Sequence, residues 1–306
     1  MSIASATHAP GVGQPAPSAP EPAGRRGRRT PYLLLLPGLL WLLAFFAVPL
    51  VTLAGTSTQT PAPSGETGAF QQTFRLANYV DALVAYAPQF GRSFLYALIA
   101  TALALAIGYP LAYAIAFKVG RWRNVLLVLV VAPFFCSFIL RTIAWRQILA
   151  DEGFVVRTLK SLHLISPTTT LTASAVAVVA GITYNFLPFM TLPLYASLER
   201  IDPRLLEAGA DLYGNGATVF RKVTFPLSMP GVVAGTLLTF IPAAGDFVNA
   251  ALLGTSRTTM IGNVVQSRFF TIVDYPTAAA LSFLLMAAIV VLVIAYVRRA
   301  GTEELV

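Results

Sequence analysis

The sequence predicts an all-α membrane protein with six transmembrane helices, and three observations lead to this prediction. Hydrophobic residues make up 56% of the 306 residues and charged residues only 11%, a composition outside the range of soluble domains. The mean hydropathy is +0.72. The net charge is +8, but the Lys and Arg residues lie in short clusters beside apolar runs, where basic residues set membrane topology. The charge therefore indicates a lipid bilayer as the partner and argues against nucleic acid.

The amino-terminal segment, residues 1–30, is rich in Ala, Pro, Gly and Ser. This composition predicts a disordered cytoplasmic tail. Four arginines between residues 25 and 29 precede the first apolar run, about Tyr32–Leu53, in a pattern similar to a secretory signal. The run is longer than a typical signal core and no small-residue cleavage site follows it, so we favour an uncleaved first span.

The rest of the chain contains five further apolar runs of membrane length. In the second of the six spans, Pro110 is preceded by Gly108 and marks a place where a transmembrane helix can kink at modest cost. A turn with three basic residues, 118–123, separates the second span from the third. We expect residues 31–300 to form one six-helix membrane domain and residues 301–306 a short cytoplasmic tail. The predicted spans two to six are about Phe90–Phe117, Val125–Leu149, Leu171–Leu198, Met229–Leu253 and Ala278–Val297.

The distribution of basic residues predicts the orientation of these spans. Placing the amino terminus in the cytoplasm puts 13 of the 21 Lys and Arg residues on that side. The positive-inside rule then predicts that both termini are cytoplasmic. The longest helix-competent segment of mixed polarity between two spans, 199–228, also lies on the cytoplasmic side.

Cysteine and histidine usage limits the chemistry of the chain. Its one cysteine, Cys136, lies inside an apolar run, so the sequence predicts neither a disulfide framework nor a thiol metal site. The histidines, His8 and His163, are far apart and have no ligand-type neighbours at metal-binding spacing. We expect no metal site and no catalytic residues.

The segment 199–228 carries apolar residues at helical spacing, interrupted by Gly214, Asn215 and Gly216. The pattern predicts two short helices joined by a sharp turn. Pattern alone also fits an amphipathic loop that lies on the membrane surface.

The residues of this segment resemble the EAA loop of permease subunits in ATP-binding-cassette (ABC) importers. Gly209 replaces the second alanine of that motif, and Tyr213 occupies its usual glycine place, with Gly214 one residue later. The positions that match are Glu207, Ala208, Asp211, Leu212, Phe220, Pro226, Leu227, Pro230 and Gly231.

This resemblance implies that the segment is a coupling loop, whose first short helix docks on a separate ATPase subunit. Glu207 is then expected to meet a basic or backbone donor group there, while Ala208 and Gly209 keep the helix narrow and Gly214 acts as a hinge. The chain has no GxxxxGK[ST] phosphate loop, so ATP and Mg are expected on a dimer of ATPase subunits. This chain is expected to bind no cofactor and to be a non-catalytic transport subunit.

A second resemblance concerns the solute. The segments Ile241–Gly254, Ile261–Val265 and 133–155 are similar to the first permease subunit of spermidine/putrescine importers. This implies transport of a small cationic solute across a bacterial cytoplasmic membrane. The implied partners are a second, related permease subunit and an extracytoplasmic solute-binding protein. Another small organic solute or a metal complex is the alternative.

Asp246 is a candidate for the substrate pathway. It follows Pro230 by 16 residues, or about 24 Å of helix, which places a carboxylate in the outer half of the bilayer, where charge is costly unless it has a function. Asn249, Tyr184 and Trp145 are its expected polar or cation–π neighbours. The alternatives are an ion pair with Arg141 or Arg146, or exposure at the outer interface.

Two functions of another class are also consistent with a six-helix membrane chain. An ion-coupled carrier would transport without an ATPase partner. A membrane enzyme would need several titratable residues at membrane depth, and only Asp246 is clearly placed there.

Overall fold

The computed structural model describes residues 30–63 and 65–300, so the expected tails at 1–29 and 301–306 lie outside the described residues. Contacts divide the chain into two compact units, which meet in the sequence at Val51 and Thr52. The helices are α1 Thr30–Leu42, α2 Val48–Ser57, α3 Ala77–Phe117, α4 Arg123–Val131, α5 Phe138–Ile148, α6 Phe154–Ser161, α7 Ala175–Glu199, α8 Pro203–Tyr213, α9 Gly216–Val219, α10 Phe225–Leu227, α11 Met229–Ala244, α12 Val248–Leu253, α13 Ile261–Gln266 and α14 Tyr275–Ala300.

The expected first span is a helix in the structure. A π-helical turn, Leu43–Ala47, joins α1 to α2. Together they supply an apolar helical stretch, Leu35–Ser57, of 23 residues. Its length of about 35 Å is sufficient to cross the hydrocarbon core of a bilayer.

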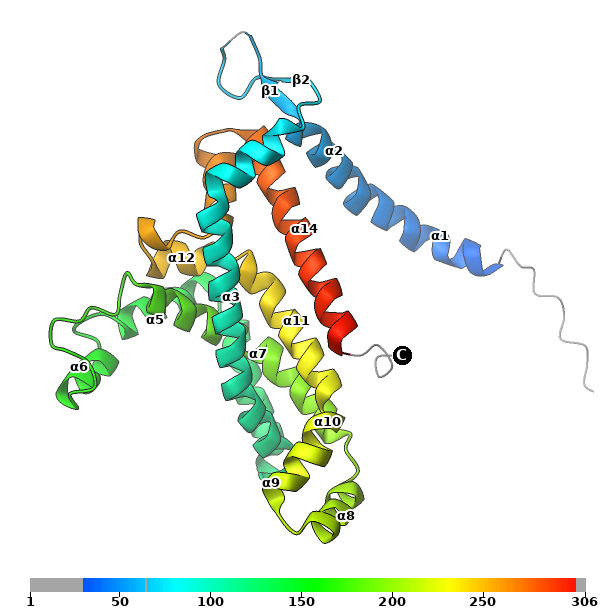
Figure 1. Ribbon diagram of the computed structural model, residues 1–306, viewed down its shortest axis with the longest axis vertical. Coiled ribbons are helices and arrows are strands. Elements are labelled where there is room, and N and C mark those ends of the chain that lie inside the picture. The colour runs from blue at the N-terminus through cyan, green and yellow to red at the C-terminus, as the bar shows by residue number, and fades with distance from the viewer. Residues whose placement is uncertain (1–29, 64, 301–306) are drawn as a thin grey trace, which may run out of the picture. The chain divides into compact units, whose positions relative to one another are not determined.

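Three long helices, α3, α7 and α11, pack together and form the core of the second unit (Figure 1). Small residues allow their backbones to approach closely, as is common between membrane helices. A Cβ atom added at Gly231 would lie 2.5 Å from Cβ of Ser197, and one added at Gly235 would lie 2.9 Å from Sδ of Met190. The Gly231-xxx-Gly235 spacing therefore places α11 directly against α7.

The second expected span is longer than predicted, because α3 includes the polar segment before it and begins at Ala77. Its backbone departs from helical geometry at Tyr86, with φ −119° and ψ 15°. Pro88, two residues later, lacks a backbone N–H and its ring collides with the preceding turn. At Pro110, where the sequence allows a kink, the backbone keeps helical φ and ψ angles.

The third and fifth expected spans are each interrupted. The helical segments Gly120–Phe135 and Phe138–Ile148 meet at 98°, because Cys136 and Ser137 have extended backbone with ψ of 148° and 134°. The fifth span ends at Ala244, after which a non-helical segment leads to α12. Each of these two spans therefore consists of two helical segments and not of one continuous helix.

The count of spans agrees with the prediction. Among the described residues, four helices are long and apolar enough to cross a membrane. Two bent pairs, Gly120–Phe135 with Phe138–Ile148 and Gly216–Leu227 with Met229–Ala244, supply two more when each pair is counted as one span. The fold is thus an all-α membrane fold with six spans.

The two ends of α3 carry different structures (Figure 1). One end lies beside a hairpin of two antiparallel strands, β1 Gln59–Pro61 and β2 Phe70–Gln72, in which Thr60 pairs with Gln71. The other end lies beside α8, α9 and α10. We call the segment from α8 to α10, Pro203–Leu227, the arm.

Candidate functional site

The arm contains the two short helices and the turn that the sequence predicts. Asp202 caps α8 by accepting a hydrogen bond from the N–H of Arg204 at 2.9 Å, and Pro203 occupies the first helical position. The helix ends at Gly214, whose φ of +63° is a left-handed conformation that suits glycine. Asn215 then caps α9 by accepting from the N–H of Ala217 at 2.9 Å.

The two faces of α8 have different environments. A Cβ atom added at Gly209 would lie 3.2 Å from Cγ2 of Val223 and 3.3 Å from Cγ1 of Val219. Gly209 thus allows α8 to pack on the second half of the arm, so this residue lies on the inner side of the helix; whether it keeps α8 narrow enough to dock stays a prediction. The opposite face is open to solvent and presents Glu207, Ala208, Asp211 and Leu212.

Aromatic rings join the arm to α3. Phe220 begins a π-helical turn, Phe220–Thr224, and its ring packs edge-on against Tyr109 at 5.6 Å. Phe225 packs against the same tyrosine ring at 6.0 Å. The hydroxyl groups of Tyr109 and Ser228 form a buried hydrogen bond of 2.7 Å. Movement of the arm would therefore displace α3 through Tyr109.

Ser228 also marks the junction between the arm and the fifth span. The helical segments Gly216–Leu227 and Met229–Ala244 meet there at 64°. Pro226 lies in the single turn α10 just before the bend. Because Ser228 is fully buried and bonded to α3, the bend is held at a defined place.

A buried polar layer surrounds the candidate pathway residue Asp246. Its Oδ1 accepts from the N–H of Asn249 at 2.9 Å, and its Oδ2 accepts from Nδ2 of Asn249 at 3.0 Å. Nδ2 of Asn185 on α7 donates to Oδ1 of Asn249 at 3.0 Å and to Oγ1 of Thr142 on α5 at 3.2 Å. Four residues from four segments thus form one hydrogen-bonded layer.

The surroundings of Asp246 decide between the alternatives for this residue. Its side chain is 6% exposed, so it does not lie at an exposed interface. Within residues 30–63 and 65–300, no ion pair joins it to Arg141 or Arg146. Its partner is the expected Asn249, and it holds the first turn of α12 as an N-terminal cap does.

Trp145 and Tyr184, the other two expected pathway residues, are in contact with each other. The rings of Trp145 on α5 and Tyr184 on α7 pack edge to face with centroids 5.3 Å apart. In the described part of the chain, no hydrogen bond links either ring to Asp246. The connection is indirect, because Tyr184 adjoins Asn185 and Trp145 lies one helical turn from Thr142.

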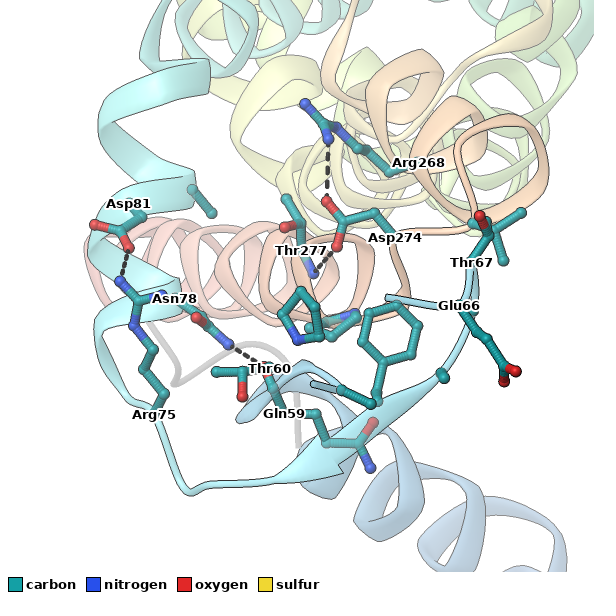
Figure 2. A pocket seen from close by; sticks show the side chains of 18 of the residues that line it. Gln59, Thr60, Glu66, Thr67, Arg75, Asn78, Asp81, Arg268, Asp274 and Thr277 are labelled. Carbon is teal, nitrogen blue, oxygen red and sulfur yellow. Dashed lines mark hydrogen bonds and ion pairs between the residues drawn. The ribbon is translucent and has the colours of Figure 1, made fainter. Parts of the chain in front are cut away.

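A polar pocket of about 530 Å³ lies at the hairpin end of α3. Figure 2 shows two ion pairs at its walls: Arg268 with Asp274, and Arg75 with Asp81, each at 3.0 Å. Nδ2 of Asn78 donates to the carbonyl of Gln59 at 2.8 Å and ties the hairpin to α3. The pocket walls come from the hairpin, the start of α3 and the start of α14.

Some residues of the site were not predicted from the sequence. The Tyr109–Ser228 bond joins residues 119 positions apart, so no local pattern indicates it. Asn185 and Thr142 lie within predicted spans, and polar residues at membrane depth were a usable signal for them.

The chain is similar to known transport proteins. A family model described as "Binding-protein-dependent transport system inner membrane component" matches residues 108–300. The spermidine/putrescine transport system permease protein PotB of Escherichia coli (strain K12) is 34% identical over 259 residues, which cover 84% of this chain and 93% of that protein. The protein of the same name from Haemophilus influenzae is 38% identical over 200 residues, which cover 65% of this chain and 70% of that protein.

Solved structures share the fold. A bacterial alginate ABC transporter, crystallised in complex with an alginate pentasaccharide-bound periplasmic protein, contains a chain that matches with a TM-score of 0.67. The match covers 88% of this chain and 93% of that chain at 18% sequence identity. The family match, the relatives and the shared fold agree with one another. This chain belongs to the family of binding-protein-dependent transport system inner membrane components, the permease subunits of ABC importers.

Proposed function

We propose that the chain forms half of the translocation pathway of a polyamine importer, for a solute such as spermidine or putrescine. The observation that carries this proposal is the similarity to two spermidine/putrescine permeases over most of the chain. The similarity includes α5, α7 and α12, which supply the buried polar layer and the Trp145–Tyr184 ring pair. Aromatic rings and buried acceptors suit a protonated amine.

The arm is the proposed docking site for the ATPase subunits. Its exposed face presents Glu207, Ala208, Asp211 and Leu212, and the side chain of Leu212 is 73% exposed. An apolar side chain flanked by two carboxylates is suited to a cleft with an apolar floor and basic or backbone donors at its rim. ATP and Mg belong to that ATPase dimer, and this chain is non-catalytic.

Coupling then passes through the root of the arm. Closure of the ATPase dimer displaces α8, and Gly209 transmits the displacement to Val219 and Val223 by direct contact. Phe220 and the Tyr109–Ser228 bond carry it to α3 and α11. Since α3, α7 and α11 pack as one core, they would rotate together.

Asp246 contributes to the pathway in two ways: it positions α12, and its charge changes the electrostatic potential around it. Both of its oxygens accept hydrogen bonds from Asn249, so it holds α12 against α5 and α7. A carboxylate held in a buried layer also lowers the electrostatic potential nearby and favours a passing cation.

The remaining partners follow from the same proposal. A second permease subunit completes the pathway, and an extracytoplasmic binding protein delivers the solute. The pocket near the hairpin lies at the opposite end of α3 from the arm (Figure 1), which suits contact with the binding protein. Both termini then lie in the cytoplasm.

Uptake measurements test this function directly. Cells that lack the chain should lose uptake of labelled spermidine and putrescine, and unchanged uptake of both would exclude the polyamine assignment. Reconstitution with and without the ATPase distinguishes the importer from a carrier that acts alone. ATP-independent uptake by the chain in liposomes would favour the carrier.

The docking of the arm has its own test. Glu207→Lys reverses a charge on the exposed face of α8 and should lower uptake at least tenfold while membrane insertion stays normal. Glu152→Lys makes the same change at an exposed residue between α5 and α6 and should leave uptake within twofold of the native value. Equal uptake by the two variants would contradict docking through α8.

A further inference from the structure

Arg141 is a buried cation that the proposed mechanism does not use. Its side chain is 8% exposed, and neither Nε nor Nη1 has a hydrogen-bond partner. Among the described residues, no carboxylate forms an ion pair with it. A guanidinium in this condition is uncommon, because buried charges are normally paired.

The position of Arg141 along the membrane helices can be inferred from its neighbour Thr142. The next residue, Thr142, is bonded to Asn185. Asn185 lies ten residues after the start of the 25-residue helix α7, or about 15 Å along a helix of about 37 Å. Arg141 therefore lies close to the level of the middle of α7, a helix that is long enough to cross a bilayer.

Two aromatic rings take the place of a counter-ion. Cζ of Arg141 lies 5.8 Å from the ring centroid of Phe134 and 5.6 Å from that of Phe138. The 98° bend at Cys136 and Ser137 brings the two rings to one side chain, although they belong to different helical segments. Attraction between a cation and a ring face is strongest where water is excluded.

Further rings fix this pair in position. Phe134 packs edge-on against Phe189 at 5.4 Å, and Phe138 packs against Phe186 at 6.0 Å. Phe186 and Phe189 both lie on α7 and contact each other at 6.0 Å. The cluster has an open side, because Phe134 is 49% exposed. We call Phe134 and Phe138 the cation cage.

We propose that the cation cage is a binding site for a protonated alkylamine of the cargo, and that the guanidinium of Arg141 occupies it when cargo is absent. This rests on the proposed transport of a cationic solute. A protonated amine needs the same ring faces that Arg141 uses. When Arg141 leaves the cage, its Nε and Nη1 lose no hydrogen bond there, and the incoming amine takes over the attraction of the two rings.

The position of the cage suits a step in translocation. Trp145 lies one helical turn beyond Arg141, and its ring meets that of Tyr184. The aromatic surface therefore continues past the cage toward the polar layer of Asn185 and Asn249. With Arg141 in the cage, a fixed positive charge opposes the passage of small inorganic cations, and a polyamine displaces it by filling the same site.

Direct binding to the purified transporter tests the cage. The transporter, with its ATPase and second permease subunit, is placed in lipid nanodiscs without the binding protein. Arg141→Gln removes the resident cation and should tighten spermidine binding about tenfold. Phe134→Leu or Phe138→Leu, added to Arg141→Gln, keeps the apolar volume, removes the ring face and should abolish that gain. Phe135→Leu is the matched control, since its side chain is 86% exposed.

Several results would overturn the proposal. If the Arg141→Gln variant binds spermidine no more tightly than the native chain, the guanidinium of Arg141 does not compete with spermidine for the cage. If the tighter binding of spermidine persists in both leucine variants, the rings of Phe134 and Phe138 do not bind the amine. Equal binding of octane-1,8-diol, a neutral chain of similar length, means that the site is only apolar.

A second measurement covers a failure of Arg141→Gln to assemble. In the otherwise native chain, Phe138→Leu should raise the KM for uptake about tenfold, whereas Phe135→Leu should not change it; equal KM values would overturn the proposal. The binding assay also separates this proposal from the proposed function. Normal polyamine uptake in cells lacking the chain refutes the function, while binding of simple alkylamines to the purified transporter still reports on the cage.

Discussion

At the scale of single residues, Asp246 shows how a charge is accommodated at membrane depth. Both oxygens of its carboxylate accept hydrogen bonds from Asn249, three residues later. That spacing is the one at which a capping side chain reaches the backbone N–H of a helix. The same residue is therefore a pathway candidate and the acceptor that holds the first turn of α12.

The Asp246–Asn249 pair predicts a reciprocal rescue. Asp246→Asn turns an amide donor toward Nδ2 of Asn249 and should lower the free energy of unfolding by about 1–2 kcal/mol. Adding Asn249→Asp restores one donor and one acceptor, and it keeps the acceptor for Asn185 and Thr142. Thermal unfolding of the purified chain measures both variants. A double variant no more stable than Asp246→Asn would contradict the pairing.

The sequence indicated these residues but not their arrangement. Burial of Asp246 followed from its place in an apolar run, and Asn249 was expected nearby because it is close in sequence. An ion pair with Arg141 was equally consistent with the sequence, because which side chains share a face depends on the bend at Cys136 and Ser137. That bend comes from the backbone angles of two residues, and hydropathy does not report on them.

At the scale of elements, the arm is a lever with a defined root. The helices α8 and α9 are held at a fixed angle by Gly214 and by the caps from Asp202 and Asn215. The root is Phe220 with the Tyr109–Ser228 hydrogen bond. The arm can transmit a displacement to α3 only if these contacts at its root remain formed while it moves.

The root predicts an uncoupling phenotype. Tyr109→Phe and Ser228→Ala each break the buried hydrogen bond and should show an interaction energy of about 1 kcal/mol in a double-mutant cycle on stability. The ratio of solute transported to ATP hydrolysed should fall at least twofold in either variant. Tyr113→Phe is the control, because the Tyr113 ring also packs on Phe220 and should keep the native ratio.

A different pattern of results would refute this role. Loss of stability without a change in the transport ratio would make the bond merely structural. A fall in the ratio for Tyr113→Phe as large as that for Tyr109→Phe would show that the effect is not specific to the Tyr109–Ser228 hydrogen bond.

Sequence patterns predicted where helices form better than they predicted how helices pack on one another and where their backbones break. Helical spacing and the Gly214–Gly216 cluster indicated both helices of the arm. The inward packing of Gly209 was not predicted, because which side of α8 is covered depends on Val219 and Val223 in the second half of the arm. Pro110 marks a place where a helix can kink, and the backbone departs from helical geometry at Tyr86, before Pro88.

At the scale of the whole molecule, six spans were predictable because hydropathy reports on burial in lipid whether or not a helix is bent. The bent pairs satisfy the same length and composition as straight helices. Bends depend on local backbone conformation, so hydropathy gave no indication of the breaks in the third and fifth spans.

The orientation in the membrane can be tested by labelling. Replacing the one cysteine by Cys136→Ser allows single reporters at Thr67→Cys in the hairpin and Ala217→Cys in the arm, both exposed positions. A membrane-impermeant maleimide added to intact spheroplasts should label the first and not the second. Labelling of Ala217→Cys from outside would reverse the orientation that the basic residues predict.

The π-helical turn at the root of the arm, Phe220–Thr224, has a consequence for chain length. A π-helical turn contains one residue more than an α-helical turn of the same span, and each residue of a helix turns the chain by about 100°. Loss or gain of one residue there would rotate α8 around the arm's axis and point Glu207 away from its present direction. The number of residues in this turn therefore determines the direction in which the exposed face of α8 points.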